Sequence, residues 1–221
     1  LAVSLAKNSQ LKVGLLDADI YGPSQPKMMG LEGGKPEFTD EKKIIPPVSN
    51  DVCVMSIGFM VDAAKALVWR GPMVQSAVYQ LFRDVQWADA GEELDVLIVD
   101  MPPGTGDAQL TLAQKVPVTG AVIVSTPQDI ALADARKGVE MFRAVDVSIL
   151  GIIENMSTHV CTNCGHEEHI FGHGGAKAEA ERWGVPFLGE IPLSAEIRQK
   201  ADQGQVFDIG AEIIERLGLN S

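Results

Sequence analysis

Apolar runs alternate with longer amphipathic stretches along most of the 221-residue chain. Six short apolar segments are expected to form strands, at residues 12–17, 52–57, 94–100, 120–126, 149–155 and 185–191. Several are apolar without strict alternation, which is typical of strands covered on both faces. Helical periodicity follows at residues 72–85, 107–115, 129–145, 174–183, 194–202 and 211–217. Repeated strand-then-helix units predict an α/β fold with a mostly parallel sheet and helices on both faces.

Two segments depart from this pattern. Residues 21–50 hold five of the twelve prolines, which predicts a long loop with little regular structure. Residues 156–175 hold two of the three cysteines and all four histidines, and they also lack periodicity. We expect residues 1–221 to form one domain, with 156–175 as a metal-binding loop inside it.

The charge and cysteine content narrow the class of protein. The chain carries 18 basic and 30 acidic residues, so its formal net charge is −12. This sign argues against nonspecific binding to nucleic acid and to anionic membranes, because phosphate attracts cations. No apolar run reaches the roughly 18 residues of a membrane span. An odd, low number of cysteines favours a reducing compartment, the cytoplasm or alternatively the mitochondrial matrix.

Carboxylates follow two of the expected strands. Asp17 and Asp19 come after the first, and Asp100 ends another, directly before Met101 and the sequence PPGTGD. In α/β proteins ligands bind at the carboxyl ends of strands, and carboxylate oxygens suit Mg²⁺. The Gly-Thr-Gly turn then opens a helix whose amides can face a phosphate. The alternative is an ordinary strand-to-helix turn capped by Asp107.

These segments resemble a known family. The motifs LLDADIYGPS, VWRGPM, LIVDMPPGTGD, STPQDIALADARKG, GIIENMS, CTNCGH, IFGHGG and FLGEIPL occur in the order found in the Mrp/ApbC iron–sulfur carrier ATPases. That family belongs to the deviant Walker A class of P-loop NTPases, together with MinD, ParA and the nitrogenase iron protein. The resemblance covers essentially the whole chain and implies a MinD/ParA-like three-layer fold that binds ATP and Mg²⁺.

The resemblance also implies roles for single residues. Asp17 and Asp19 match the second aspartate motif, with Asp19 orienting the attacking water. Asp100 matches the Walker B aspartate, which holds Mg²⁺ through water. Switch II corresponds to Gly104, Thr105, Gly106 and Asp107. Asn155 matches the residue that reads adenine, and Pro192 matches one that lines the base. An asparagine at a strand end is also a common turn former.

The family's phosphate loop, Gly-Lys-Gly-Gly-Val-Gly-Lys-Ser/Thr, does not occur in the sequence. The resemblance places it shortly before Leu1, with LAVSLAK as the later part of the helix that follows the loop. We therefore expect that the 221-residue sequence is a truncation or an incompletely recorded N-terminus. We also expect it to lack the first strand and the loop that carries most phosphate contacts.

Cys161 and Cys164 form a CxxC pair followed by Gly165. Two thiols supply half of a four-ligand site, and spacing alone leaves iron–sulfur and zinc open. The histidines at 159, 166, 169 and 173 could complete a zinc site within one chain. The resemblance implies instead a [4Fe–4S] cluster shared by two protomers of a homodimer. Cys53 lies in an apolar strand and is expected to be a core residue.

The function predicted from these observations is that of an ATP-dependent iron–sulfur cluster scaffold or carrier. It would hold a [4Fe–4S] cluster across a homodimer, deliver it to apo-proteins and hydrolyse ATP slowly as a switch. Two alternatives stay open. One is a MinD/ParA-like ATPase switch without a cluster, and the other is an interaction module stabilised by a zinc knuckle.

Overall fold

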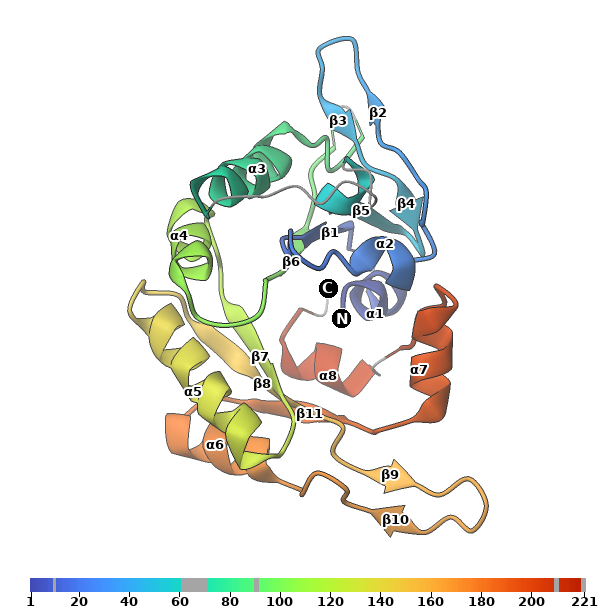
Figure 1. Ribbon diagram of the computed structural model, residues 1–221, viewed down its shortest axis with the longest axis vertical. Coiled ribbons are helices and arrows are strands. Elements are labelled where there is room, and N and C mark those ends of the chain that lie inside the picture. Colours follow the sequence, from blue (N-terminus) through green and yellow to red (C-terminus); the bar gives the residue numbers. More distant parts are fainter. Residues whose placement is uncertain (10, 61–70, 90–91, 209–210, 220–221) are drawn as a thin grey trace.

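The computed structural model describes residues 1–9, 11–60, 71–89, 92–208 and 211–219. The first sheet has the strand order β4-β5-β1-β6, in which β1 pairs in parallel with β5 and β6 (Figure 1). Its strands are β4 (Val48–Ser49), β5 (Val52–Ser56), β1 (Val13–Asp17) and β6 (Val96–Asp100). All five residues of β1 are buried, which explains its unbroken apolar run.

The second sheet has the strand order β11-β8-β7, and all its pairings are parallel. Its strands are β11 (Phe187–Ile191), β8 (Ile149–Asn155) and β7 (Ala121–Ser125). The parallel pairing confirms the α/β class. Each of the six expected strands is present, and most are one or two residues shorter than predicted.

Helices cover the sheets and join them. The longer ones are α1 (Ala2–Asn8), α3 (Gly71–Asp84), α4 (Asp107–Lys115), α5 (Asp129–Arg143), α6 (Gly175–Trp183), α7 (Ala195–Asp202) and α8 (Ala211–Arg216). Helices α5 and α6 pack on the second sheet, and α8 contacts both α1 and β11. Two neighbouring residues of α8 belong to different hydrophobic cores. Ile214 packs into the core of the first sheet, and Ile213 packs into a core of the second sheet.

The parallel strands form two sheets rather than one. Strand β6 is the edge of the first sheet and β7 is the edge of the second. Every residue of β6 is only partly buried, and the side chain of Val124 on β7 is 58% exposed. Strands this apolar are normally paired on both sides in a parallel sheet. Strands β6 and β7 therefore have sequences typical of central strands. Among the described residues, however, no strand lies between these two edges.

The expectation of an irregular segment at 21–50 is wrong in part. The segment contains the short helix α2 (Gln25–Met28), the hairpin strands β2 (Glu37–Phe38) and β3 (Ile44–Ile45), and β4. Helix α2 packs on α7, where Gly30 and Gly204 approach so closely that a Cβ on Gly204 would lie 2.4 Å from the Gly30 Cα. A single turn is too short to produce a helical period, so the pattern could not reveal it.

In the described part of the chain, no helix is both long enough and apolar enough to cross a lipid bilayer.

Candidate functional site

Asp17 and Asp100 lie side by side at the carboxyl ends of β1 and β6, in direct register. The Asp17 side chain is fully buried. Its Oδ1 accepts from the Asp19 amide at 3.1 Å, and its Oδ2 accepts from the Ser56 hydroxyl at 3.0 Å and from the Gln25 amide at 3.2 Å. Burial raises the pKa of Asp17, and the three hydrogen bonds oppose that rise. The adjacent Asp100 carboxylate raises it further.

Asp100 is held by a residue from α2. The Gln25 side-chain amide donates to Asp100 Oδ2 at 2.6 Å, while the Gln25 backbone amide bonds Asp17. Burial raises the pKa of Asp100, the Gln25 bond opposes the rise, and the charge of Asp19 adds to it. Gln25 thus joins the two aspartates that the sequence placed on separate strands.

Asp19 lies in the turn after β1 and is partly exposed. Its Oδ1 accepts from the backbone amides of Tyr21 and Gly22, both at 3.2 Å. Because Asp17 bonds the Asp19 amide and the charge of Asp19 acts on Asp100, the structure brings all three predicted aspartates together. We call Asp17, Asp19 and Asp100 the acidic group.

The loop after β6 leads directly from the acidic group to α4. Gly104 has φ +96°, a conformation that favours glycine, and Gly106 is the N-cap residue of α4. The buried side chain of Gln109 donates to the Pro103 carbonyl at 2.7 Å and holds the loop from inside. Gly104, Thr105 and Gly106 are exposed. Asp107 begins α4, and its side chain is not among those that the structure describes.

A second set of predicted residues lies at the ends of β8 and β11. Asn155 is in register with Ile191, directly before Pro192. The Asn155 Oδ1 accepts from the Met156 amide at 3.0 Å, and Met156 has φ +58°. The Asn155 side chain therefore bonds the bend that follows β8, while Pro192 lies exposed across the strand pair from it.

The CxxC pair lies on a hairpin that continues from β8 and projects beyond the second sheet (Figure 1). Its strands are β9 (His159–Val160) and β10 (Glu167–Glu168), which pair antiparallel. The Cys161 amide donates to the His166 carbonyl at 2.9 Å, and the Gly165 amide donates to the Cys161 carbonyl at 2.8 Å. Gly165 has φ +72°, so glycine closes the knuckle without strain.

The knuckle places hydrogen-bond donors around the Cys161 thiol. The pKa of this thiol is lowered by the backbone amides of Asn163 and Cys164, and by a hydrogen bond from the Cys164 thiol. Since the thiolate is the form that binds metals, this arrangement favours coordination. Cys161 is half-buried and Cys164 is exposed. Cys53, by contrast, is half-buried in β5, and burial raises the pKa of its thiol.

Three of the four histidines have other partners. His159 Nδ1 lies 3.1 Å from the Leu193 carbonyl, and His169 Nδ1 lies 3.1 Å from the Ser157 carbonyl. His173 Nε2 lies 3.3 Å from Glu190 Oε2. These contacts fasten the hairpin to the ends of β8 and β11, together with backbone bonds at Ser157 and Leu193.

Sequence reasoning missed two members of the acidic site, Gln25 and Ser56. Ser56 is fully buried and caps the short helix after β5 by accepting from the Gly58 amide at 3.0 Å. Its position at a strand end was the available signal. Trp69 and Arg70 of the VWRGPM motif lie outside the described residues.

Comparisons with known proteins identify the family of the chain. A family model described as the ParA-type NUBPL iron-transfer P-loop NTPase matches residues 1–215. The chain belongs to this family. It is 55% identical over 206 residues to the iron-sulfur cluster carrier protein of Pseudomonas fragi, with 93% of this chain and 70% of that protein covered. It is 52% identical over 204 residues to the carrier protein of Escherichia coli K12.

This NUBPL-family chain spans about half of the Escherichia coli relative, since the match covers 92% of the chain and 54% of that protein. Among solved structures, it resembles the nucleotide-binding protein of Archaeoglobus fulgidus in complex with ADP, in which cobalt was found. That match has a TM-score of 0.81 and 37% identity, covering 97% of this chain and 82% of the other. MinD of Aquifex aeolicus shares the fold, at a TM-score of 0.61 and 15% identity, with 98% and 86% covered.

Proposed function

We propose that this chain belongs to an iron–sulfur cluster carrier that uses ATP as its switch. The observation that carries the proposal is the exposed CxxC knuckle, with a Cys161 thiol whose pKa is lowered, on a chain of the P-loop NTPase class. The related proteins of Pseudomonas fragi and Escherichia coli are named iron-sulfur cluster carrier proteins. The cluster is cargo here, and apo iron–sulfur proteins would receive it.

The cysteine pair fits a cluster shared between two copies of the chain. A [4Fe–4S] cluster takes four thiolates, and the hairpin supplies two. A two-fold axis beside Cys161 and Cys164 would bring their equivalents from a second protomer to the same cluster. In the described residues, neither cysteine belongs to a group of three or more close metal-ligating side chains within one protomer. Coordination at an exposed, shared knuckle would leave the cluster accessible for transfer.

The acidic group fits a magnesium nucleotide. Mg²⁺ prefers oxygen ligands and retains water, and three carboxylates at adjoining strand ends offer such a surface. Asp100 would hold the ion through water and Asp19 would orient the attacking water. Asp17 would hold the turn by its bonds to Ser56 and Gln25. The loop of Gly104, Thr105, Gly106 and Asp107 would respond to the γ-phosphate, with catalysis by positioning and electrostatics.

Asn155 and Pro192 would hold the adenine base. They flank one strand pair, and the backbone of Ser157 and Thr158, directly before the hairpin, bonds the backbone of Ile191 and Leu193. The proposed base site and the cysteine hairpin are therefore both held by residues 191–193. A nucleotide that shifts this turn would shift the hairpin, which supports the proposal that ATP controls cluster retention.

Anaerobic reconstitution with iron and sulfide tests the cargo. We expect about four irons per dimer and loss of all bound iron in Cys161→Ser and in Cys164→Ser, with the fold retained because the hairpin is peripheral. Cys53→Ala is the matched control, since that thiol is half-buried in β5, burial raises its pKa, and it should not ligate. Iron retained in either hairpin variant contradicts the assignment. Stoichiometric zinc instead indicates the zinc-knuckle module, and a protein that dimerises with ATP without metal indicates a MinD/ParA-like switch.

We expect the affinity for ATP to differ between this chain and a form of the protein that carries a phosphate loop. We expect the 221-residue chain alone to bind ATP weakly or not at all, because the loop amides and lysine supply most phosphate contacts. In the part of the chain that the structure describes, no strand pairs with the outer edge of β6 or of β7, which supports the proposal that a further strand, the one ahead of that loop, lies between the sheets. Micromolar affinity in a calorimetric titration of the 221-residue chain would contradict it.

A further inference from the structure

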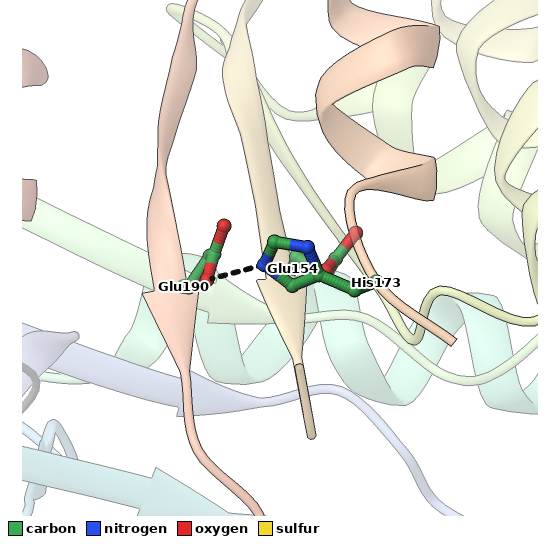
Figure 2. A group of neighbouring side chains, drawn as sticks. All are labelled: Glu154, His173 and Glu190. Atoms are coloured by element: carbon green, nitrogen blue, oxygen red, sulfur yellow. Dashed lines mark hydrogen bonds and ion pairs between the residues drawn. The ribbon is translucent and has the colours of Figure 1, made fainter. Parts of the chain in front are cut away.

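Three metal-ligating side chains from separate elements meet at the far edge of the second sheet. Glu154 lies on β8, Glu190 on β11 and His173 in the loop before α6 (Figure 2). One ligand atom from each lies within 4.8 Å of those of the other two. Neither the cysteine knuckle nor the acidic group contains these residues.

The two glutamates form an unfavourable pair on their own. Glu154 and Glu190 are in direct register on neighbouring parallel strands, and Glu154 is fully buried. Like charges this close repel one another, and a buried carboxylate is stabilised by hydrogen bonds or by a cation. A cation placed between the two carboxylates would relieve this repulsion. In Figure 2 the imidazole of His173 reaches back from its loop to the ends of both strands.

Glu154 is fixed in place before any cation binds. Its Oε1 accepts from the Gly174 amide at 2.9 Å, and its Oε2 accepts from the Ala176 amide at 2.8 Å, both at the start of α6. An ionised carboxylate has about four lone-pair sites, so each oxygen keeps one for a further ligand bond. The amides thus orient Glu154 in the way that outer partners orient metal ligands.

The histidine is also oriented. His169 stacks on His173 with ring centroids 4.3 Å apart, and His169 is itself bonded to the Ser157 carbonyl. His173 Nε2 and Glu190 Oε2 are 3.3 Å apart. Two ligands about 2.0–2.1 Å from one tetrahedral ion are separated by roughly this distance. The side chains of His173 and Glu190 are 44% and 35% exposed, so a cation can enter from solvent.

We propose that Glu154, Glu190 and His173 Nε2 bind one divalent first-row transition-metal ion, such as Zn²⁺ or Mn²⁺. One imidazole and two carboxylates match the ligand preferences of these ions and differ from the sulfur ligands of a cluster. The ion replaces the like-charge repulsion with coordination and joins β8, β11 and the glycine-rich start of α6. Because Asn155 and Pro192 lie directly beyond Glu154 and near Glu190, the site stiffens the strand ends assigned to the base.

Mn²⁺ binding to the Cys161→Ser/Cys164→Ser protein tests the site without the competing thiols. We expect bound Mn²⁺ to show coupling to an imidazole nitrogen in pulsed electron paramagnetic resonance. The acidic group contains no histidine, so Mn²⁺ bound there gives no such signal. His173→Ala should abolish the nitrogen coupling, and Glu190→Gln should weaken the affinity of the coupled site by about tenfold or more.

His166→Ala is the matched control, because His166 is an exposed histidine of the same segment outside the cluster. The coupling should persist in that variant, and far-ultraviolet circular dichroism should be the same in all variants. Absence of nitrogen coupling in the parent protein overturns the proposal, as does coupling that survives in His173→Ala. In either case His173 and Glu190 form only a hydrogen-bonded pair.

Discussion

The acidic group and the CxxC hairpin both follow strand ends, but they differ in how completely the chain surrounds them. Asp17 is fully buried and takes three hydrogen bonds from three different segments. The cysteines lie on a hairpin of two-residue strands, where backbone amides of the knuckle itself lower the pKa of Cys161. One site is part of the core, whereas the other is attached to it by a few contacts.

This difference has a physical meaning for the two proposed tasks. A site that positions water and phosphate requires groups that do not reorganise, and the first sheet supplies that rigidity. A site that releases its cargo requires access and a weak hold, which an exposed, two-ligand knuckle provides. The acidic group is also internally strained, because burial and neighbouring charges raise the pKa values of Asp17 and Asp100.

We expect Asp100→Asn to give the largest difference in effect between the acidic group and the CxxC hairpin. In a form of the protein that carries a phosphate loop, Mg²⁺-dependent ATP hydrolysis should fall by about 10–100-fold, as for loss of an outer-shell metal partner. Cluster content after reconstitution should stay unchanged. Phosphate-release kinetics and iron analysis measure the two quantities. Equal turnover in the variant and the parent would show that Asp100 takes no part in ATP hydrolysis.

The same substitution should increase stability at neutral pH. Burial raises the pKa of Asp100 above its ordinary value of 3.8, so the folded state binds more protons than the unfolded state between those two values. The unfolding free energy therefore falls as the pH rises through that interval. Asparagine carries no charge, so the variant should be more stable at pH 7 and lose this advantage below pH 3.8. Urea unfolding at several pH values measures it, and an advantage independent of pH would contradict the electrostatic cause.

A smaller effect is expected from Gln25→Glu, which places a carboxylate where the amide now donates to Asp100. Loss of this donor should lower the unfolding free energy by roughly 1–3 kcal/mol. Gln25→Glu combined with Asp100→Asn restores a donor–acceptor pair and should recover most of the loss. Chemical unfolding of both variants measures this, and if the double variant recovers nothing, the bridge is not the cause.

The smallest effect is expected from Gly165→Ala in the knuckle. At φ +72° alanine is strained by roughly 1–2 kcal/mol, and no heavy atom lies within 4 Å of the added Cβ. The thermal midpoint should scarcely change, because the hairpin is peripheral, but bound iron should be lost faster. Gly33→Ala is the matched control, with φ +75° and equally open surroundings in a loop outside the hairpin. Equal iron retention in the two variants would show that knuckle geometry does not control the cluster.

Much of the architecture was readable from the pattern. The run at 149–155 was predicted to the residue, and the helix at 107–115 also matches α4. The acidic residues were found because carboxylates after buried strands stand out. Gln25 was missed because it lies on a helix of one turn within a proline-rich segment, where periodicity carries no signal.

The sequence by itself determined the strands, the order of the motifs and the residues that carry carboxylates and thiols, because these depend on local composition and spacing. Only the tertiary structure decided which of them meet. Gln25 reaches Asp100 across 75 residues, and His173 reaches Glu190 across 17. The pairing of Glu154 with Glu190 follows from the register of two parallel strands. Register and helix packing arise from burial of the whole core, so no local pattern specifies them.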